Sequence, residues 1–175
     1  ITDFAELMDE IQEYPLRTVA VAVAQKPGVI EAMKLAMEAD IARPILVGDN
    51  SEICEIADET GLDTGEVEII DEPNDLQAAA KATSLVNSGE ADVLMKGHIH
   101  TDDFLRAILD KETGLRTGCI MSHVFVLETP DRGRLTFVTD GAMNIEPDLV
   151  TKASIIMNAV YLARCFGVSK PKVAV

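Results

Sequence analysis

An alternation of strand-like and helix-like segments between residues 17 and 111 constrains the fold of this chain most strongly. Short apolar runs alternate with longer segments whose apolar residues recur at helical spacing, and Pro, Asn, Ser or Gly stands at several of their ends. The predicted strands are 17–24, 44–48, 66–70 and 91–95, and the predicted helices are 27–39, 50–61, 73–88 and 101–111. This order predicts an α/β fold in three layers, with a mostly parallel sheet covered by helices on both faces.

The pattern changes near Gly114. Two strand-like runs, 119–127 and 134–138, are joined by a short segment with Pro, Asp and Gly, which predicts a β-hairpin. A long helix over about residues 147–166 follows, and the final Pro171–Val175 segment is typical of the beginning of a buried strand. A free carboxylate at the end of an interior strand would be costly to bury, so we expect a longer chain, truncated here.

These two patterns predict two parts in the chain. We expect residues 1–113 to form a first α/β lobe and residues 114–175 to begin a second lobe, whose remainder is missing. A chain of 175 residues is long enough to build a core of this kind.

The net charge of −15 is unevenly distributed along the chain. Residues 1–75 hold 19 acidic and 4 basic side chains, whereas residues 76–175 hold 11 of each. An acidic first half argues against nucleic acid or an anionic membrane as the main partner. No apolar run approaches the roughly 20 residues of a membrane-spanning helix. The three cysteines are widely spaced, which favours a reduced, cytoplasmic enzyme over a disulfide scaffold or a zinc site.

Lys96 and Gly97 follow directly on the predicted strand 91–95, and His100 and Thr101 open the next helix. A buried strand thus delivers a cation, a flexible backbone corner and a helix N-terminus to one point, which predicts a site for phosphate or carboxylate. A surface lysine and a simple helix cap at Thr101 are the alternatives. Neither a Walker loop nor a G-x-G-x-x-G fingerprint occurs, and two histidines at positions 98 and 100 have poor spacing for a metal site.

Arg106 lies one to two turns into the helix that begins near Thr101. It shares a helix face with Asp102 and Asp103, so it forms either a surface ion pair or a bidentate contact to a bound phosphate. Ser122 lies next to His123 in the predicted strand 119–127, where successive side chains point to opposite faces, so the two cannot both serve one pocket directly, which disfavours a nucleophile–base pair. Asn144 follows a strand exit, where it either binds a ligand or shapes a turn.

Several separated blocks of sequence together resemble one enzyme family. In order, they are ADVLMKG-x-x-HT-x-DFLRA-x-L-x-KE-x-GLRTG, MSHVFV, RL-x-FVTD-x-AMNI-x-PDL and NAV-x-LA-x-x-x-GV-x-x-PKVAV. This pattern is similar to the phosphate acetyl/butyryltransferase family, and to its butyryl branch above all. The resemblance covers nearly the whole chain and is strongest from Ala91 onward.

The resemblance implies a reversible reaction in which acyl-CoA and inorganic phosphate give acyl phosphate and CoA. It implies the two-lobed fold of isocitrate and isopropylmalate dehydrogenases, an active site between the lobes and a homodimer. CoA is then a substrate, and neither a permanently bound cofactor nor a metal is expected. Family chains continue beyond the PKVAV segment, and the Ser-Arg and Asp residues tied to catalysis in the acetyl branch lie in that part.

The resemblance also bears on particular residues. Lys96-Gly97 matches the Lys-Gly of the butyryl branch, and Arg106 matches an arginine in the active-site cleft of the acetyl branch. We therefore expect catalytic roles for Lys96 and Arg106. Substrate-binding roles are expected at Gly97, His100, Thr101, Ser122 and Asn144. Two other functions remain open: a non-catalytic domain that binds CoA or another anion, and a hydroxy-acid dehydrogenase on the same fold.

Overall fold

The computed structural model describes residues 1–129 and 133–175. They form two compact units, one of residues 14–117 and one that joins residues 1–13 to residues 118–175. Residues 1–13 thus group with the C-terminal part of the chain, which differs from the predicted division at residues 113 and 114. The chain is mixed α/β, with a mostly parallel sheet.

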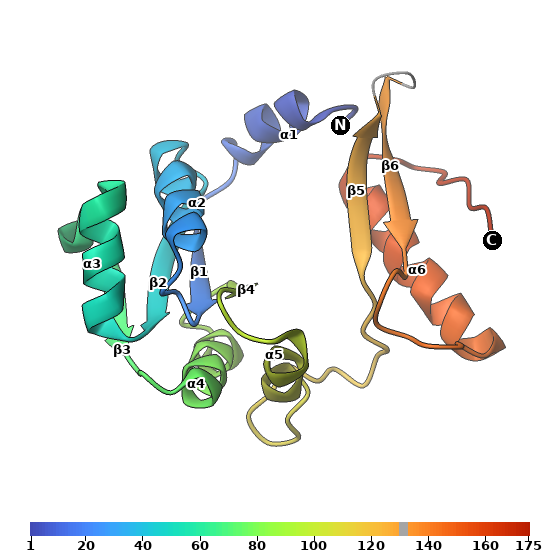
Figure 1. The fold of residues 1–175 in the computed structure, drawn as a ribbon. Helices are drawn as coiled ribbons and strands as arrows, with labels where there is room; N and C mark the ends of the chain where they lie inside the picture. The colour runs from blue at the N-terminus through green and yellow to red at the C-terminus, as the bar shows by residue number, and fades with distance from the viewer. Residues whose placement is uncertain (130–132) are drawn as a thin grey trace. The chain divides into compact units, whose positions relative to one another are not determined.

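The larger unit contains a four-stranded parallel sheet (Figure 1). Its strands are β1 (Arg17–Ala22), β2 (Ala42–Gly48), β3 (Glu68–Asp71) and β4 (Val93–Lys96), in the spatial order β3-β2-β1-β4. The helices between them are α2 (Pro27–Glu38), α3 (Asn50–Thr60), α4 (Asp75–Ser88) and α5 (Thr101–Ile108), with a short 3₁₀ turn at Thr64–Glu66. The predicted alternation of strands and helices is therefore confirmed, with boundaries that differ by a few residues.

The two faces of the sheet are buried in separate clusters. Val19 and Val21 of β1 pack in the cluster that contains residues of α2 and α3, and Ala20 packs in the cluster that contains residues of α4. This separation follows from the strand geometry, because successive side chains point to opposite faces. The α4 cluster is rich in alanine, whose small side chains allow a helix to lie close to the sheet.

Helix ends in this unit are fixed by local residues. Pro27 lies in the first turn of α2, and Gly61 and Gly89 end α3 and α4 in the left-handed conformation, with φ of 73° and 82°. The cap of α3 differs from the expectation: Asp49, not Asn50 or Ser51, accepts a hydrogen bond from the backbone N–H of Glu52 at 3.0 Å. An Asp at this position suits the N-cap equally well, which explains the one-residue shift.

The smaller unit is built on an antiparallel hairpin and a long helix (Figure 1). The strands β5 (Val124–Thr129) and β6 (Arg134–Thr139) pair directly, and α6 (Leu149–Cys165) packs on β6. The hairpin is confirmed, while its connecting residues 130–132 lie outside the described part of the chain. A helix that the sequence pattern did not indicate, α1 (Phe4–Ile11), joins this unit, where the Phe4 N–H donates to a carboxylate oxygen of Glu128 at 3.0 Å.

Two predicted strand segments of this unit are wrong. Residues 119–123 precede β5 without being part of it, and Pro171–Val175 is irregular. In the first segment, side-chain amides replace strand pairing: Asn144 and Asn158 donate to the carbonyl oxygens of Met121 and Ile120 at 3.0 and 2.9 Å. Ser122 therefore lies in a loop, and the strand geometry expected for it does not apply.

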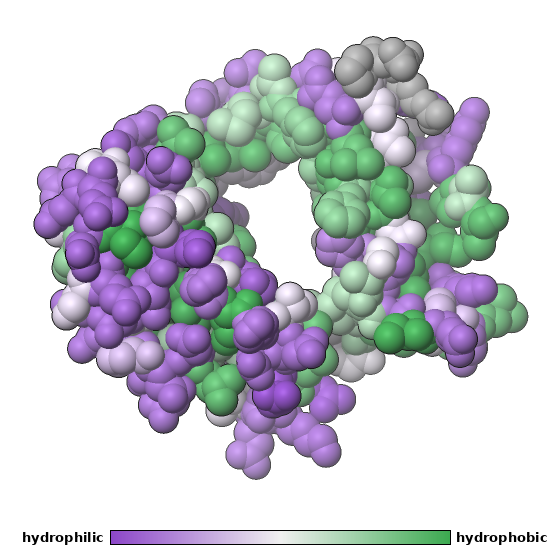
Figure 2. Space-filling model, viewed as in Figure 1, coloured by the Kyte–Doolittle hydropathy of each residue, from purple (hydrophilic) through white to green (hydrophobic). Residues whose placement is uncertain are grey.

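The surfaces of the two units differ in hydropathy. On the face shown in Figure 2, hydrophilic side chains cover most of the unit with α2 and α3, and hydrophobic side chains gather on the unit with β5 and β6. In α6, Leu149, Val150 and Tyr161 are each more than 70% exposed, so this helix is apolar on its solvent side as well. Across the described residues, no helix combines the length and hydropathy needed to cross a membrane.

Candidate functional site

Lys96 and Gly97, two of the predicted anion-binding residues, lie at the carboxyl edge of the four-stranded sheet, and His100 and Thr101 follow at the start of α5. The chain runs from β1 outward to β2 and β3, and then returns to place β4 on the other side of β1. This reversal puts a topological switch point between β1 and β4, where open α/β sheets usually bind their ligands. Lys96 is the last residue of β4 and pairs with Ala22, the last residue of β1.

Gly97 is held tightly against the end of β1. Its backbone N–H donates to the carbonyl oxygen of Ala22 at 2.9 Å, and the His98 N–H donates to that of Val23 at 2.7 Å. A Cβ atom at residue 97 would lie 2.2 Å from the Val23 oxygen and 2.6 Å from the Ala22 oxygen. Glycine is thus needed for close packing of two strand ends. Because the N–H is already engaged, any contribution of Gly97 to anion binding comes from its lack of a side chain.

Val23 has an unusual backbone conformation at the same edge. Its φ is 59°, in the left-handed region that a β-branched residue rarely adopts, and such a residue costs about 1–3 kcal/mol. The side chains of Ala22 and Val23 both enter the cluster beneath α4, whereas Ala24 enters the opposite cluster. The turn at Val23 therefore interrupts the strand alternation where β1 ends, and changes the direction in which the following residues leave the sheet.

Two helices that begin at this edge lack a side-chain cap. Lys26 and His100 are the N-cap residues of α2 and α5, and neither side chain accepts a hydrogen bond from the helix. The caps of α1, α3, α4 and α6, by contrast, are Asp or Asn side chains that do accept one. Thr101 is the first helical residue of α5 and not its N-cap, which corrects the alternative role considered for it. Backbone N–H groups at such ends are available to an anion.

Three cations lie on elements that end or begin at this edge: Lys96 ends β4, Lys26 is the N-cap residue of α2, and Arg106 lies in α5. The Lys96 ammonium group is exposed and lies 3.4 Å from the carbonyl oxygen of Gly97. Arg106 forms an ion pair with Asp103, with 2.6 Å between Nη1 and Oδ1, while its side chain is 71% exposed. An exposed pair of this kind contributes at most about 1 kcal/mol, so a phosphate group could replace Asp103 as the partner at little cost.

Ser122 and Asn144 lie in the smaller unit, where both are already hydrogen-bonded. The Asn158 amide donates to the Ser122 hydroxyl at 2.9 Å, and the Asn144 amide donates to the Met121 carbonyl and to Asp140. The two side chains thus hold neighbouring parts of one loop cluster. Their predicted role beside Lys96 depends on how the two units are arranged, and it stays a prediction.

The residues from 72 to 175 match the phosphate acetyl/butaryl transferase family. The chain belongs to this family. Phosphate butyryltransferase from Clostridium acetobutylicum is 47% identical over 174 residues, which are 99% of this chain and 58% of that protein. Phosphate acetyltransferase from Rhizobium meliloti is 41% identical over 148 residues, 85% of this chain and 46% of that protein.

Solved structures of the same class agree with the fold. A branched-chain phosphotransacylase from Enterococcus faecalis superposes with a TM-score of 0.75 at 30% identity, over 89% of this chain and 54% of that one. The chain therefore spans about half the length of the relatives it matches. The family resemblance inferred from the sequence blocks is confirmed.

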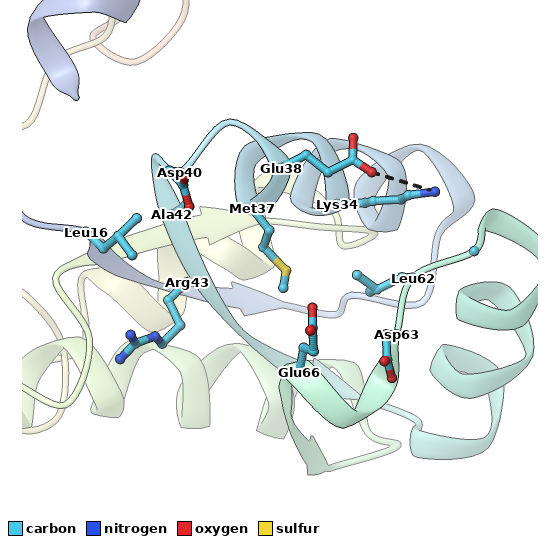
Figure 3. A pocket seen from close by; sticks show the side chains of 11 residues that line it. Leu16, Lys34, Met37, Glu38, Asp40, Ala42, Arg43, Leu62, Asp63 and Glu66 are labelled. Atoms are coloured by element: carbon cyan, nitrogen blue, oxygen red, sulfur yellow. Dashed lines mark ion pairs between the residues drawn. The ribbon is translucent and has the colours of Figure 1, made fainter.

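The larger unit contains a cavity of about 550 Å³ (Figure 3). It lies where α2 ends and β2 begins, at the amino edge of the sheet, and no predicted site residue lines it. Lys34 lies beside it and is paired with Glu38 at 4.0 Å, and the Lys34 ammonium group also donates to the Thr60 carbonyl at 3.0 Å. Its lining holds more carboxylates than cations, which disfavours a phosphate ligand.

The predicted site residues do not include Gln25, a polar residue at the carboxyl edge of the sheet. Gln25 directly follows the apolar run 17–24, just as Lys96 follows the run 91–95, and the same argument about strand ends applies to both. No group of three or more His, Cys, Asp or Glu side chains that could hold a metal ion is found in residues 1–129 and 133–175.

Asp140 organises the loop cluster of the smaller unit and should make its stability depend on pH. Burial raises the pKa of Asp140, but hydrogen bonds from the Asn144 amide and from the backbone N–H groups of His123, Met143 and Ala142 lower it by more. The net pKa is below that of a free Asp, so ionised Asp140 stabilises the fold above pH 4, and this stabilisation is lost as the pH falls through the lowered value.

We expect Asp140→Asn to lower the free energy of unfolding at pH 7 by about 1–3 kcal/mol. Both carboxylate oxygens of Asp140 accept hydrogen bonds, and in Asn one of them is replaced by an NH₂ group, which faces other N–H donors. Urea unfolding followed by circular dichroism at pH 7 and pH 3 measures this effect. The difference between the two proteins should shrink at pH 3, and a difference that is the same at both pH values would contradict the assignment. Asp9→Asn, at an exposed position of α1, is the control.

Proposed function

We propose that the protein transfers a short acyl group between CoA and inorganic phosphate, so that acyl-CoA and phosphate give acyl phosphate and CoA. One observation supports this proposal most directly: the switch point between β1 and β4 combines Lys96 with two helices whose N-termini have no side-chain cap. This arrangement suits a phosphate group. Its occurrence in a chain 47% identical to a phosphate butyryltransferase links the geometry to phosphate as a substrate.

The reaction requires positioning and electrostatic stabilisation. A phosphate oxygen attacks the thioester carbonyl carbon, a C–O bond forms, and the carbonyl electrons move to the oxygen. When this oxyanion collapses, the C–S bond breaks and CoA leaves as a thiolate, which is protonated from solvent. Holding the two substrates in line contributes up to roughly 7–11 kcal/mol in well-aligned systems. Each hydrogen-bond donor aimed at the oxyanion contributes roughly 3–4 kcal/mol.

In this proposal the residues of α5 and β4 hold the phosphate. Lys96 and Arg106 neutralise its charge, and the N-terminus of α5 at His100 and Thr101 offers backbone donors, with Gly97 leaving room for close approach. The carboxylates of Asp102 and Asp103, in the first turn of α5, repel a bound phosphate. Both Lys96 and Arg106 are therefore needed to offset this repulsion. Ser122 and Asn144 are proposed to bind acyl-CoA.

The remaining expectations belong to the complete protein. We propose an isocitrate dehydrogenase-like arrangement of two lobes, a homodimer and a cytoplasmic location, with CoA as a substrate and no permanently bound cofactor. Light scattering after size-exclusion chromatography measures the oligomeric state.

We expect the complete gene product to release CoA thiol from acetyl-, butyryl- or branched acyl-CoA only when phosphate is present. Thiol release is followed with a thiol-reactive dye, with and without phosphate, and the acyl preference is ranked in the same assay. Release that does not depend on phosphate would indicate a thioesterase. CoA binding without turnover would support the non-catalytic binding domain, and a requirement for NAD and a divalent metal would support the dehydrogenase.

A further inference from the structure

The hairpin of the smaller unit has one face that is covered and one that is not. Its inner face packs against α6, and the ring of Phe137 in β6 meets that of Phe166, at the end of α6, edge to face with 5.4 Å between their centroids. Because successive side chains of a strand point to opposite faces, Phe125, Leu127 and Val138 share the other face. They are 52%, 43% and 44% exposed, and we call them the outer face.

The outer face is a continuous apolar surface that crosses both strands. Phe125 of β5 pairs directly with Val138 of β6, and Leu127 lies two residues further along β5. The ring of His123 extends this surface, because it contacts the Phe125 ring with 4.0 Å between the two centroids. Where one face of an antiparallel sheet is solvated, that face usually carries polar side chains. An apolar outer face is therefore typical of a sheet that is covered on both sides.

The smaller unit also buries few side chains of its own. Among its described residues, only Leu135, Ile155 and Ala163 are buried hydrophobic residues, whereas the larger unit buries both faces of its sheet in extensive clusters. A two-stranded hairpin is marginally stable without further strands or a covering helix, and a compact domain has a hydrophobic core of its own. Since α6 covers the inner face alone, the core of this unit needs a second layer on the outer face.

We propose that this second layer is formed by the residues of the complete protein that lie outside the present 175. The matched residues are 58% of the phosphate butyryltransferase from Clostridium acetobutylicum, and the chain covers 54% of the Enterococcus faecalis phosphotransacylase. Each relative therefore has enough further chain for a layer of helices or strands. A second copy of this unit would bring the same small core, which favours the same polypeptide as the occupant. The inference does not depend on the proposed function.

Leu127→Ala in the complete gene product tests whether the outer face is buried there. Truncation of a buried leucine leaves a cavity, so we expect the melting temperature to fall by at least about 5 °C. Leu35→Ala is the matched control, because Leu35 of α2 is 64% exposed in the larger unit. The same substitution there should change the melting temperature by less than about 2 °C. Equally small effects of the two substitutions would contradict the proposal.

Photo-crosslinking identifies what covers the outer face. Benzoylphenylalanine, a photoreactive analogue, takes the place of Phe125 in the complete gene product, and the linked peptides are mapped by mass spectrometry after illumination. We expect a link within one polypeptide, from Phe125 to a peptide outside the present 175 residues. A link between two copies would instead make the outer face a subunit interface. That result would overturn the inference, and so would a link confined to residues 1–175 or the absence of any link.

Discussion

Gly97→Ala should destabilise the protein strongly, by about 3 kcal/mol or more. The added Cβ atom would lie 2.2 Å and 2.6 Å from two carbonyl oxygens of the β1 end, and these belong to backbone that cannot rotate away. Relief requires β4 and β1 to separate, which breaks the bonds from Gly97 to Ala22 and from His98 to Val23. Overpacking alone usually costs about 1–3 kcal/mol, and the lost hydrogen bonds add to it.

Thermal unfolding measures this effect, and a loss of about 3 kcal/mol lowers the melting temperature of a domain of this size by roughly 6–12 °C. Gly28→Ala is a matched control, because Gly28 lies in the first turn of α2 with no atom within 4 Å of a new Cβ. Alanine is the better helix former, so this variant should be as stable as the original protein or slightly more stable. Equal melting temperatures for Gly97→Ala and the original protein would show that the strand ends are not packed as described.

The architecture of residues 14–117 could be predicted because its signals are local. Alternating apolar runs, Pro27 at a helix start, and Gly61 and Gly89 at helix ends each act within a few residues, and they agree with one another. In the smaller unit the deciding interactions are long-range. The apolar residues 119–123 suit a strand, yet the amides of Asn144 and Asn158 hold them as a loop.

The candidate site also contains residues that the sequence could indicate and contacts that it could not. Lys96, His100, Thr101 and Arg106 follow one another along the chain, so a strand end and a helix start were enough to indicate them. The contact of Gln25 with Gly48 joins two strand ends, and the packing of Gly97 on Val23 joins residues 74 positions apart. A sequence pattern within one segment cannot predict such contacts, because they depend on the register and spacing of the strands in the folded sheet.

Arg106→Ala should abolish efficient use of phosphate while leaving the fold intact. We expect kcat/KM for phosphate to fall about 100- to 1000-fold, the usual effect of removing one donor that stabilises developing charge. Stability should change by less than about 1 kcal/mol, because the Arg106 side chain of the ion pair with Asp103 is 71% exposed. Arg106→Lys should recover only part of the activity, since an ammonium group cannot bind phosphate in the bidentate manner of a guanidinium.

Arg17→Ala is the matched control for this prediction. Arg17 also forms a surface ion pair, with 3.1 Å between its Nη1 and Oδ1 of Asp92, but it lies at the amino edge of the same sheet, where β1 begins. Steady-state kinetics with phosphate varied at saturating acyl-CoA separates the two arginines. If both variants depend on phosphate as the original protein does, Arg106 has no part in the site. If only Arg106→Ala loses it, phosphate binds beside α5, because both changes remove the same charge from a surface ion pair and Arg17 lies away from α5, at the amino edge of the sheet.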